Sequence, residues 1–127
     1  LFEMATNWAA ERKQFGQAIG KFQATGFKLA DMAVELRAAD LLVKDAINRA
    51  DQGVMTDSDA AMVKLYCSEM LNRVADNTLQ IYGGMGLMDD LPVQRLWRDS
   101  RLERIWDGPS EIQRHIITRN LLRPLGA

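Results

Sequence analysis

Apolar residues recur every seven positions along the middle of this chain, and that spacing restricts the possible folds more than any other feature of the sequence. The residues that follow the repeat, together with those at the companion positions, are Phe22, Leu29, Met32, Leu36, Ala39, Val43, Ala46 and Ala50. Residues separated by three, four or seven positions lie on the same side of an α-helix, so residues 22–51 are predicted to form a helix with one apolar side. Other helices have to cover that side, which predicts a helical bundle.

A second apolar stripe predicts a partner for this helix. Interrupted only by Thr78, the stripe consists of Val63, Cys67, Met70, Val74 and Ile81. Between the two stripes, Gly53 can end the first helix in a left-handed conformation, and Thr56 with Asp59 predicts a capping box for the second. The connection is short, so we expect the two helices to run antiparallel and the second to end at the Gly83-Gly84 pair.

Shorter helices are expected on either side of this pair, over residues 1–10, over residues 91–104 and from Pro109 to Pro124. No segment alternates between polar and apolar residues over a useful length. We therefore expect an all-α fold, an antiparallel four-helix bundle in up-down-up-down order with a shorter C-terminal helix, formed by residues 1–127 as a single domain. The chain starts inside a helix without an initiating methionine, which we interpret as a sign of a longer polypeptide.

Charge and composition argue against several classes of function. The 16 basic and 17 acidic residues nearly cancel, so the chain lacks the positive field that nucleic-acid binding needs. No apolar run approaches the ~20 residues of a membrane span. His115 is the only histidine and has no companion ligands, so we expect no metal site. Cys67 is the only cysteine and is expected to be a buried thiol in a reducing compartment, the alternative being a reactive nucleophile.

Two local patterns allow both a structural and a functional interpretation. Arginines at three-residue spacing over positions 95–104 are either an anion-binding row or a solvated helix face paired with Asp99 and Glu103. Asp107, followed by Gly108 and Pro109, is either an ordinary cap of the last helix or a carboxylate placed for chemistry at a helix start. Composition and spacing alone leave both alternatives open.

Three motifs together resemble one enzyme family. RKQFG at residues 12–16, QIYGGMG at residues 80–86 and WDGPSEIQR at residues 106–114 occur in the order and spacing found in the C-terminal domain of acyl-CoA dehydrogenases. Gln23, seven residues after the glycine of the first motif, and the Arg98-Asp99 pair fit the same resemblance. In that family this domain is a four-helix bundle at the core of a homo-oligomer, a dimer or tetramer.

The resemblance implies FAD as cofactor and places several residues against it. Arg12 would contact the FAD pyrophosphate, because a guanidinium binds phosphate oxygens in pairs. Phe15 and Gln23 would help to hold the cofactor of a neighbouring subunit, and Glu111 would face FAD. The stretch that matches the family's contact with the adenosine portion consists of Gln80, Ile81, Tyr82, Gly83 and Gly84.

The resemblance also implies a reaction on an acyl-CoA thioester. Asp107 lies where many members have their catalytic glutamate, which removes the α-proton while hydride passes from the β-carbon to flavin N5. A carboxylate suits this role when the acyl chain excludes water from the site. The peptide N–H of Asp107 would polarise the thioester oxygen, Gly108 would line the thioester pocket, and Trp106 would lie beside the acyl chain.

Two positions depart from the family pattern Tyr-Glu-Gly-Thr. Aspartate is one methylene shorter than glutamate, and a reacting group misplaced by about 1 Å can lose about a hundredfold in rate. Either the site brings substrate closer to Asp107, or the base lies on an earlier helix, as it does in some members. Pro109 replaces the threonine whose hydroxyl would bond the flavin, although proline remains a good helix start.

We therefore expect the C-terminal domain of an FAD-dependent acyl-CoA dehydrogenase, inactive in isolation, that reduces electron-transfer flavoprotein. Two alternatives have the same architecture. One is a helical oligomerisation module that has lost catalysis, and the other is an acyl-CoA oxidase or flavin monooxygenase. The resemblance is compatible with a bacterial cytoplasm and with the mitochondrial matrix.

Overall fold

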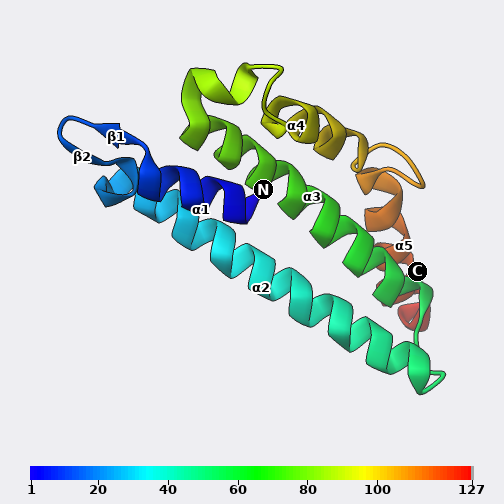
Figure 1. Ribbon diagram of the computed structural model, residues 1–127. Helices are drawn as coiled ribbons and strands as arrows, with labels where there is room; N and C mark the ends of the chain where they lie inside the picture. Colours follow the sequence, from blue (N-terminus) through cyan, green and yellow to red (C-terminus); the bar gives the residue numbers. More distant parts are fainter. Residues whose placement is uncertain (127) are drawn as a thin grey trace.

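The computed structural model describes residues 1–126 and shows a helical chain folded around two long helices (Figure 1). The elements in chain order are α1 (Phe2–Glu11), β1 (Lys13–Gln14), β2 (Gln17–Ala18), η1 (Ile19–Lys21), α2 (Gln23–Asp51), α3 (Asp57–Tyr82), η2 (Gly83–Leu87), α4 (Val93–Leu102), α5 (Ser110–Leu122) and η3 (Arg123–Leu125). Ala127, the last residue of the expected single domain, lies outside the described residues.

The two long helices begin and end where the sequence predicts. Gly53 has a φ of 69° just beyond α2, a conformation that glycine adopts without steric cost. The Thr56 side chain accepts a hydrogen bond from the Asp59 N–H, and the Asp59 carboxylate accepts one from the Thr56 N–H at 2.8 Å. The predicted capping box is therefore confirmed, and it satisfies two backbone donors that the first turn of α3 leaves unpaired.

The helices are arranged around α3, which contacts each of the other four α-helices. In Figure 1 the chain reverses direction from α1 to α2, from α2 to α3 and from α3 to α4. The fourth pass is divided between the short helices α4 and α5. The all-α class is thus confirmed, whereas a regular up-down-up-down bundle of four helices is only partly met by a single copy.

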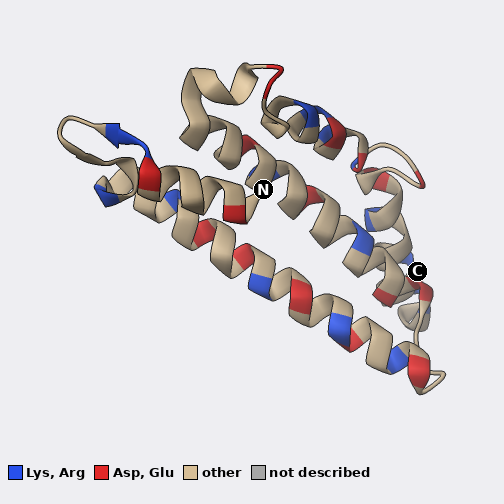
Figure 2. Cartoon of the chain, viewed as in Figure 1, with Lys and Arg blue, Asp and Glu red and all other residues tan. Residues whose placement is uncertain are grey.

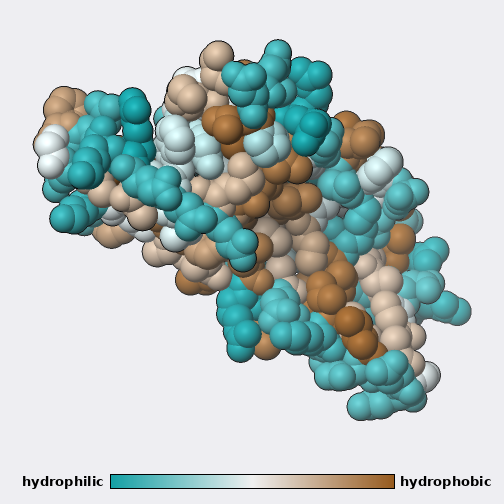
Figure 3. Space-filling model, viewed as in Figure 1, coloured by the Kyte–Doolittle hydropathy of each residue, from teal (hydrophilic) through white to brown (hydrophobic). Residues whose placement is uncertain are grey.

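The core contains many small residues, which let helix backbones approach closely. The buried residues at the meeting point of the first three helices are Ala5, Ala9, Met32, Ala39, Met70, Val74 and Ile81. Thr78, the one interruption of the predicted stripe, is fully buried among them and donates its hydroxyl to the Val74 carbonyl at 2.7 Å. A buried hydroxyl satisfied in this way does not break the apolar stripe. On the face in Figure 3, apolar side chains remain open to solvent along the line between α2 and α3.

A small β-hairpin between α1 and α2 was not predicted from the sequence. Lys13 pairs with Ala18 and Gln14 with Gln17. Phe15 and Gly16, at the tip, have φ values of 51° and 80°, as the central residues of a tight two-residue hairpin turn require. Strands of two residues are too short to produce a readable alternation, so no strand was expected here, and the all-α class is unaffected by this hairpin.

The two C-terminal helices start slightly later than expected. α4 begins at Val93 rather than Leu91, with Pro92 as its N-cap, and α5 begins at Ser110 with Pro109 as its N-cap rather than its first helical residue. Pro109 has a ψ of 165°, which is extended backbone, so the helix cannot include it. Within residues 1–126 no helix is long and apolar enough to cross a membrane.

Polar side chains of α3 hold the segment that joins α4 to α5. Lys64 donates its ammonium to the Glu103 carbonyl. Glu69 accepts a hydrogen bond from the Ser110 hydroxyl at 2.8 Å and forms an ion pair with Arg104, with 3.0 Å between Nε and Oε2. Both ends of the segment are therefore tied to one helix.

The surroundings of Glu69 favour its ionised form. Partial burial raises the pKa of the Glu69 carboxyl, but the hydrogen bond from Ser110 and the positive charges of Arg104 and Arg114 outweigh burial. The net result is a pKa below the ordinary value. Figure 2 shows acidic and basic residues interspersed along the helices.

Thr56→Ala should lower the free energy of unfolding by about 1 kcal/mol, because the first turn of α3 loses its cap. The measurement is urea denaturation followed by circular dichroism. Thr6→Ala is the matched control, since the Thr6 hydroxyl bonds only the Phe2 carbonyl within a helix and satisfies no orphan donor. Equal effects of the two substitutions would contradict the capping role.

Glu69→Gln should destabilise the fold by about 2 kcal/mol at neutral pH, because a charge-assisted anchor becomes a neutral one. A carboxyl with a lowered folded-state pKa stabilises the fold above its ordinary value of 4.5, and this contribution disappears as the pH falls through the folded-state pKa. The difference in free energy of unfolding between wild type and Glu69→Gln should therefore shrink as the pH falls.

The same denaturation experiment at neutral and acidic pH tests this prediction. Glu35→Gln serves as the control, because the Glu35–Arg73 pair is more exposed and should contribute less than about 1 kcal/mol. A difference between wild type and Glu69→Gln that does not change with pH would show that the carboxylate charge is not the cause.

Candidate functional site

The segment between α4 and α5 carries the candidate base in an unusual backbone conformation. Asp107 has a φ of 50° and Gly108 a φ of 87°, so two consecutive residues are left-handed. Aspartate tolerates this region better than most residues, but it still requires neighbouring contacts to hold it there. The direction in which Asp107 projects is therefore set by whatever fixes this segment.

A glutamine that sequence reasoning left unassigned fixes the segment from the first turn of α5. The Gln113 side-chain amide donates to the Gly108 carbonyl at 2.9 Å, and Gln113 is 7% exposed. A Cβ on Gly108 would lie 2.7 Å from Nε2 of Gln113, so any other residue there would displace this amide. The Ser110 N–H closes the segment by donating to the Arg104 carbonyl at 3.2 Å. The signal for Gln113 was its place within the WDGPSEIQR motif.

The interpretation of Asp107 as a cap of α5 is wrong. The N-cap of α5 is Pro109, and no side chain caps this helix. Within residues 1–126, the Asp107 carboxylate has no ion pair or hydrogen bond, and the peptide N–H groups of Asp107 and Gly108 have no acceptor. An exposed carboxylate thus lies next to two free backbone donors, a combination that can bind a polar group and exchange a proton with it.

The other residues predicted near substrate flank this carboxylate in sequence. Trp106 is 47% exposed and donates its indole N–H to Glu103 at 2.9 Å, so its ring is held from one side and open on the other. Glu111 is exposed in the first turn of α5, and Pro109 is half-buried. All five residues from Trp106 to Ser110, together with Glu111, therefore lie at the start of α5.

A second group of predicted residues meets at the other end of α3. Arg12 and the stretch Ile81 to Gly84 line a hollow of about 500 Å³, although some 70 positions separate them in the sequence. The remaining lining residues are Trp8, Gln14, Ile19 and Met85. A Cβ built on Gly83 or Gly84 would meet nothing within 4 Å, so these glycines present open backbone to the hollow.

The chemistry of this hollow suits an anion beside an aromatic wall. Arg12 is exposed and forms no ion pair within the described residues, so its guanidinium is available to a phosphate. Tyr82 stacks on Trp8 with ring centroids 4.6 Å apart and donates its hydroxyl to the Met4 carbonyl at 3.3 Å. Burial, and then the charge of Glu11, raises the pKa of Tyr82, which keeps the hydroxyl protonated.

Five of the predicted cofactor residues lie outside this hollow, and two of them, Pro109 and Glu111, are at the start of α5. Gln80 lines a neighbouring hollow of about 300 Å³ with Leu87. Phe15, at the hairpin tip, is 92% exposed and meets the ring of Phe22 edge-on at 6.2 Å. Gln23 is exposed at the first position of α2. A single copy therefore assembles only part of the predicted cofactor set.

The two groups of site residues are far apart in one copy. Glu69 anchors the Asp107 segment, whereas Ile81 lies twelve residues further along the same helix. At 1.5 Å of rise per residue, this corresponds to about 20 Å along α3. Figure 1 shows the hairpin end and the α4–α5 connection on opposite sides of the molecule.

The row of arginines on α4 is divided between two environments. Arg104 forms its ion pair with Glu69, while Arg98 and Arg101 line a hollow of about 840 Å³ between α3 and α4. The expected pairing of the row with Asp99 and Glu103 is not found among residues 1–126. The interpretation as a solvated face is therefore wrong in the ion-pair partners that it assigned to these arginines.

The remaining reactive side chains offer little chemistry. Burial raises the pKa of the half-buried Cys67 thiol, which opposes the thiolate that a nucleophile needs. In the described part of the chain, no three His, Cys, Asp or Glu side chains lie close enough together to hold a metal ion.

Known proteins resemble this chain over almost its full length. Residues 1–122 match the family described as acyl-CoA dehydrogenase, C-terminal domain. A 3-(aryl)acrylate reductase of Clostridium sporogenes is 43% identical over 119 residues, which cover 94% of this chain and 32% of the relative. The caffeyl-CoA reductase–Etf complex subunit CarC of Acetobacterium woodii is 41% identical over 119 residues, which cover 94% of this chain and 31% of that protein.

Solved structures agree with these sequence matches. The butyryl-CoA dehydrogenase from Megasphaera elsdenii superposes with a TM-score of 0.93 and 36% identity, over 96% of this chain and 32% of that chain. An FAD complex of PigA gives a TM-score of 0.91 and 33% identity, over 94% of this chain and 31% of that chain. The chain thus spans about a third of the length of the relatives that it matches.

The match includes the hairpin, both long helices and the segment that carries Asp107, with the same fold throughout. This chain belongs to the acyl-CoA dehydrogenase family, as that family's C-terminal domain.

Proposed function

We propose that this chain is the C-terminal domain of a flavin-dependent oxidoreductase that dehydrogenates an acyl-CoA thioester to the trans-2-enoyl thioester. The observation that carries the proposal is the Asp107 segment, an unpaired carboxylate beside two free peptide N–H groups at the start of α5. The segment is held by buried polar contacts rather than left to move with solvent.

In the proposed reaction Asp107 takes the proton from the substrate α-carbon. Its own N–H donates to the thioester oxygen, which stabilises the negative charge that develops as the proton leaves. FAD, when bound, supplies the acceptor for the hydride that leaves the β-carbon. Trp106 and Gly108 border the acyl thioester, and Pro109 and Glu111 lie on the side of the segment proposed to face the cofactor.

The hollow at the far end of α3 fits part of that cofactor. A free guanidinium and glycine backbone are the groups that bind a pyrophosphate and allow it to approach closely. We assign Arg12 to the pyrophosphate, and Gln80, Ile81, Tyr82, Gly83 and Gly84 to the adenosine side. Phe15 and Gln23 then reach the cofactor of a neighbouring copy from the hairpin end.

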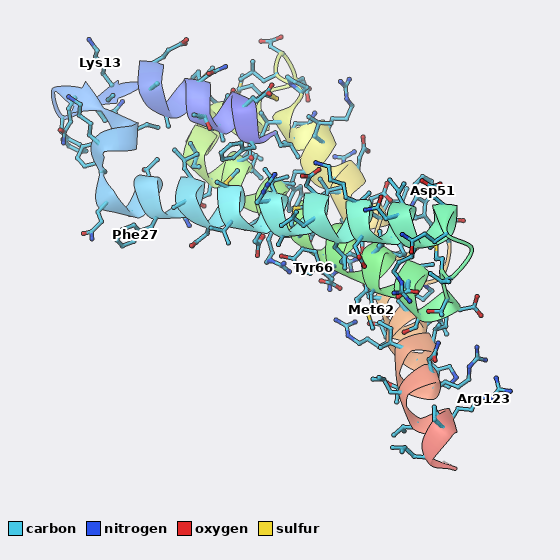
Figure 4. All side chains as sticks on the ribbon, turned by 90° about the horizontal axis from the view of Figure 1, so that it is seen from below. Lys13, Phe27, Asp51, Met62, Tyr66 and Arg123 are labelled. Carbon is cyan, nitrogen blue, oxygen red and sulfur yellow. The ribbon has the colours of Figure 1, made fainter. Side chains whose placement is uncertain are left out.

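The Asp107 segment and the Arg12 hollow lie near opposite ends of α3, so in this proposal they contact two different cofactors. Copies of the chain then have to assemble, and α2 offers a surface for that contact. Phe27, Val34 and Leu41 form an apolar stripe on its outer side, with exposed fractions of 52–70%. Figure 4 shows Phe27 pointing away from the rest of the fold. Near-heptad spacing of exposed apolar residues is typical of a helix that packs against another helix. We propose a homo-oligomer, a dimer or tetramer, with the fourth helical pass completed in the assembly.

The direction of the reaction and the electron partner are further parts of the proposal. Reduction of an enoyl thioester uses the same base and the same cofactor in reverse, and reductases occur among the relatives. We propose electron-transfer flavoprotein as the partner, in a bacterial cytoplasm or mitochondrial matrix. An acyl-CoA oxidase or flavin monooxygenase would consume oxygen instead, and an assembly module without catalysis would leave the flavin unreduced.

Asp107→Asn in the full-length flavoenzyme should abolish flavin bleaching by acyl-CoA thioesters, because an amide cannot accept the α-proton. The measurement is anaerobic titration with a panel of thioesters, followed by flavin absorbance, with binding measured in parallel. Asp45→Asn, an exposed change on α2, is the control and should bleach like wild type. Bleaching by Asp107→Asn at the wild-type rate would place the base elsewhere, and no bleaching of wild type by any thioester would remove the dehydrogenase proposal.

Val34→Glu should weaken self-association of the chain by about tenfold or more, because a charge would be buried where an apolar contact forms. Val34 is 70% exposed in one copy, so the fold itself should be unaffected. Light scattering gives the oligomeric state, and circular dichroism checks the fold. Gln52→Glu adds a charge beyond the end of the stripe and should leave association unchanged. A monomeric wild-type chain would contradict the assembly.

A further inference from the structure

We propose that Gln113 is a positioning residue for Asp107, holding it in catalytic orientation through the Gly108 carbonyl. This inference rests on the proposed function, because it concerns the same segment and the same carboxylate. It adds a residue that touches neither substrate nor cofactor but determines where the base points.

The first observation is the contact itself. Nε2 of Gln113 donates to the Gly108 carbonyl oxygen at 2.9 Å, and Gln113 is 7% exposed. A buried polar side chain is retained where its hydrogen bond is needed, since burial without a partner is unfavourable. The bond therefore persists, and it orients the Gly108–Pro109 peptide, one residue beyond the candidate base.

The second observation is the backbone that this bond restrains. Asp107 adopts a φ of 50°, in the left-handed region that residues other than glycine avoid. Such a conformation persists only when surrounding contacts fix it. The Asp107 side chain makes no contact of this kind within residues 1–126, so the restraint has to act through the backbone on either side.

The third observation is the fit between Gln113 and Gly108. A Cβ at position 108 would lie 2.7 Å from Nε2 of Gln113, well inside any real contact. Glycine at this position is favoured by its φ of 87°, and a larger residue would also displace the Gln113 amide from its place. The Gln113 amide packs against Gly108 and so restricts movement of the segment toward α5.

Gln113 itself is held in place by contacts within α5 and between α5 and α3. Its N–H donates to the Pro109 carbonyl at 3.1 Å in the first turn of α5. Ser110 ties that turn to Glu69 of α3. The contacts form a continuous path from the central helix through α5 to the Gly108 carbonyl and the adjoining Asp107, which is the support that a precisely placed base requires.

The test uses two variants of similar size that remove the donor, Gln113→Glu and Gln113→Met, in the full-length flavoenzyme. Gln94→Met is the matched control, because the Gln94 amide also donates a single side-chain bond, to Asp89 at 3.2 Å, away from the segment. Anaerobic stopped-flow reduction by a thioester that bleaches wild type gives the limiting rate and the thioester Kd separately. Hydrogen exchange of the Trp106 and Ser110 amides, which donate to the Leu102 and Arg104 carbonyls, reports the segment independently of activity.

We expect both Gln113 variants to lose at least tenfold in limiting reduction rate, with Kd, bound FAD and melting temperature close to wild type. The Trp106 and Ser110 amides should exchange faster, while the amides of α3 stay unchanged, and the Gln94→Met control should exchange like wild type. A wild-type rate in either variant overturns the proposal, and so does a rate loss that only follows lost FAD or lost folding. If no thioester reduces wild type, the proposed function fails, and unchanged exchange of the Trp106 and Ser110 amides would then separately overturn the positioning role.

Discussion

Everything in this chain depends on α3 being the helix that each of the other four α-helices contacts. A helix that meets four others has little room for large side chains, and Ala75 on α3 and Ala5 on α1 are completely buried. Small residues let the backbones approach closely, so the remaining larger side chains, such as Met32 and Val93, fill the gaps between helices. Each functional segment is consequently positioned by its contacts with α3.

The parts of the fold that could be predicted are those with long periodic signals. Apolar spacing located α2 and α3, and the capping box between Thr56 and Asp59 fixed the start of α3 to the residue. The hairpin escaped prediction because two-residue strands carry no period, and Phe15 with φ above zero is not a turn residue that composition would suggest. Long helices are specified redundantly, whereas a two-residue turn rests on a few local contacts.

The candidate site, like the fold, could be predicted from the sequence only in part. Motif resemblance selected Arg12, Ile81 to Gly84 and Asp107, and the structure gathers the first two in one hollow. Spacing could not show that Asp107 would leave the start of α5 uncapped, because that depends on the extended ψ of Pro109. Nor could it identify Gln113 or Glu69, since a polar residue on a helix is indistinguishable in sequence from a solvated one. Only the burial of the side chain and the distance to its hydrogen-bond partner distinguish an anchoring residue from a solvated one.

The separation of the two site groups along α3 gives the helix a mechanical role in the proposed assembly. The Asp107 segment is anchored near Glu69 and the anion-binding hollow near Ile81, about 20 Å apart on a single continuous helix. Hydrogen bonds along the axis resist stretching, so neither group can shift alone without breaking buried contacts to α3. If each copy supplies a base to its own substrate and a guanidinium to its neighbour's cofactor, α3 sets the spacing between the two centres. The half-buried Glu69 cluster and the stacked Trp8 and Tyr82 rings are then the two fixed points of that spacing.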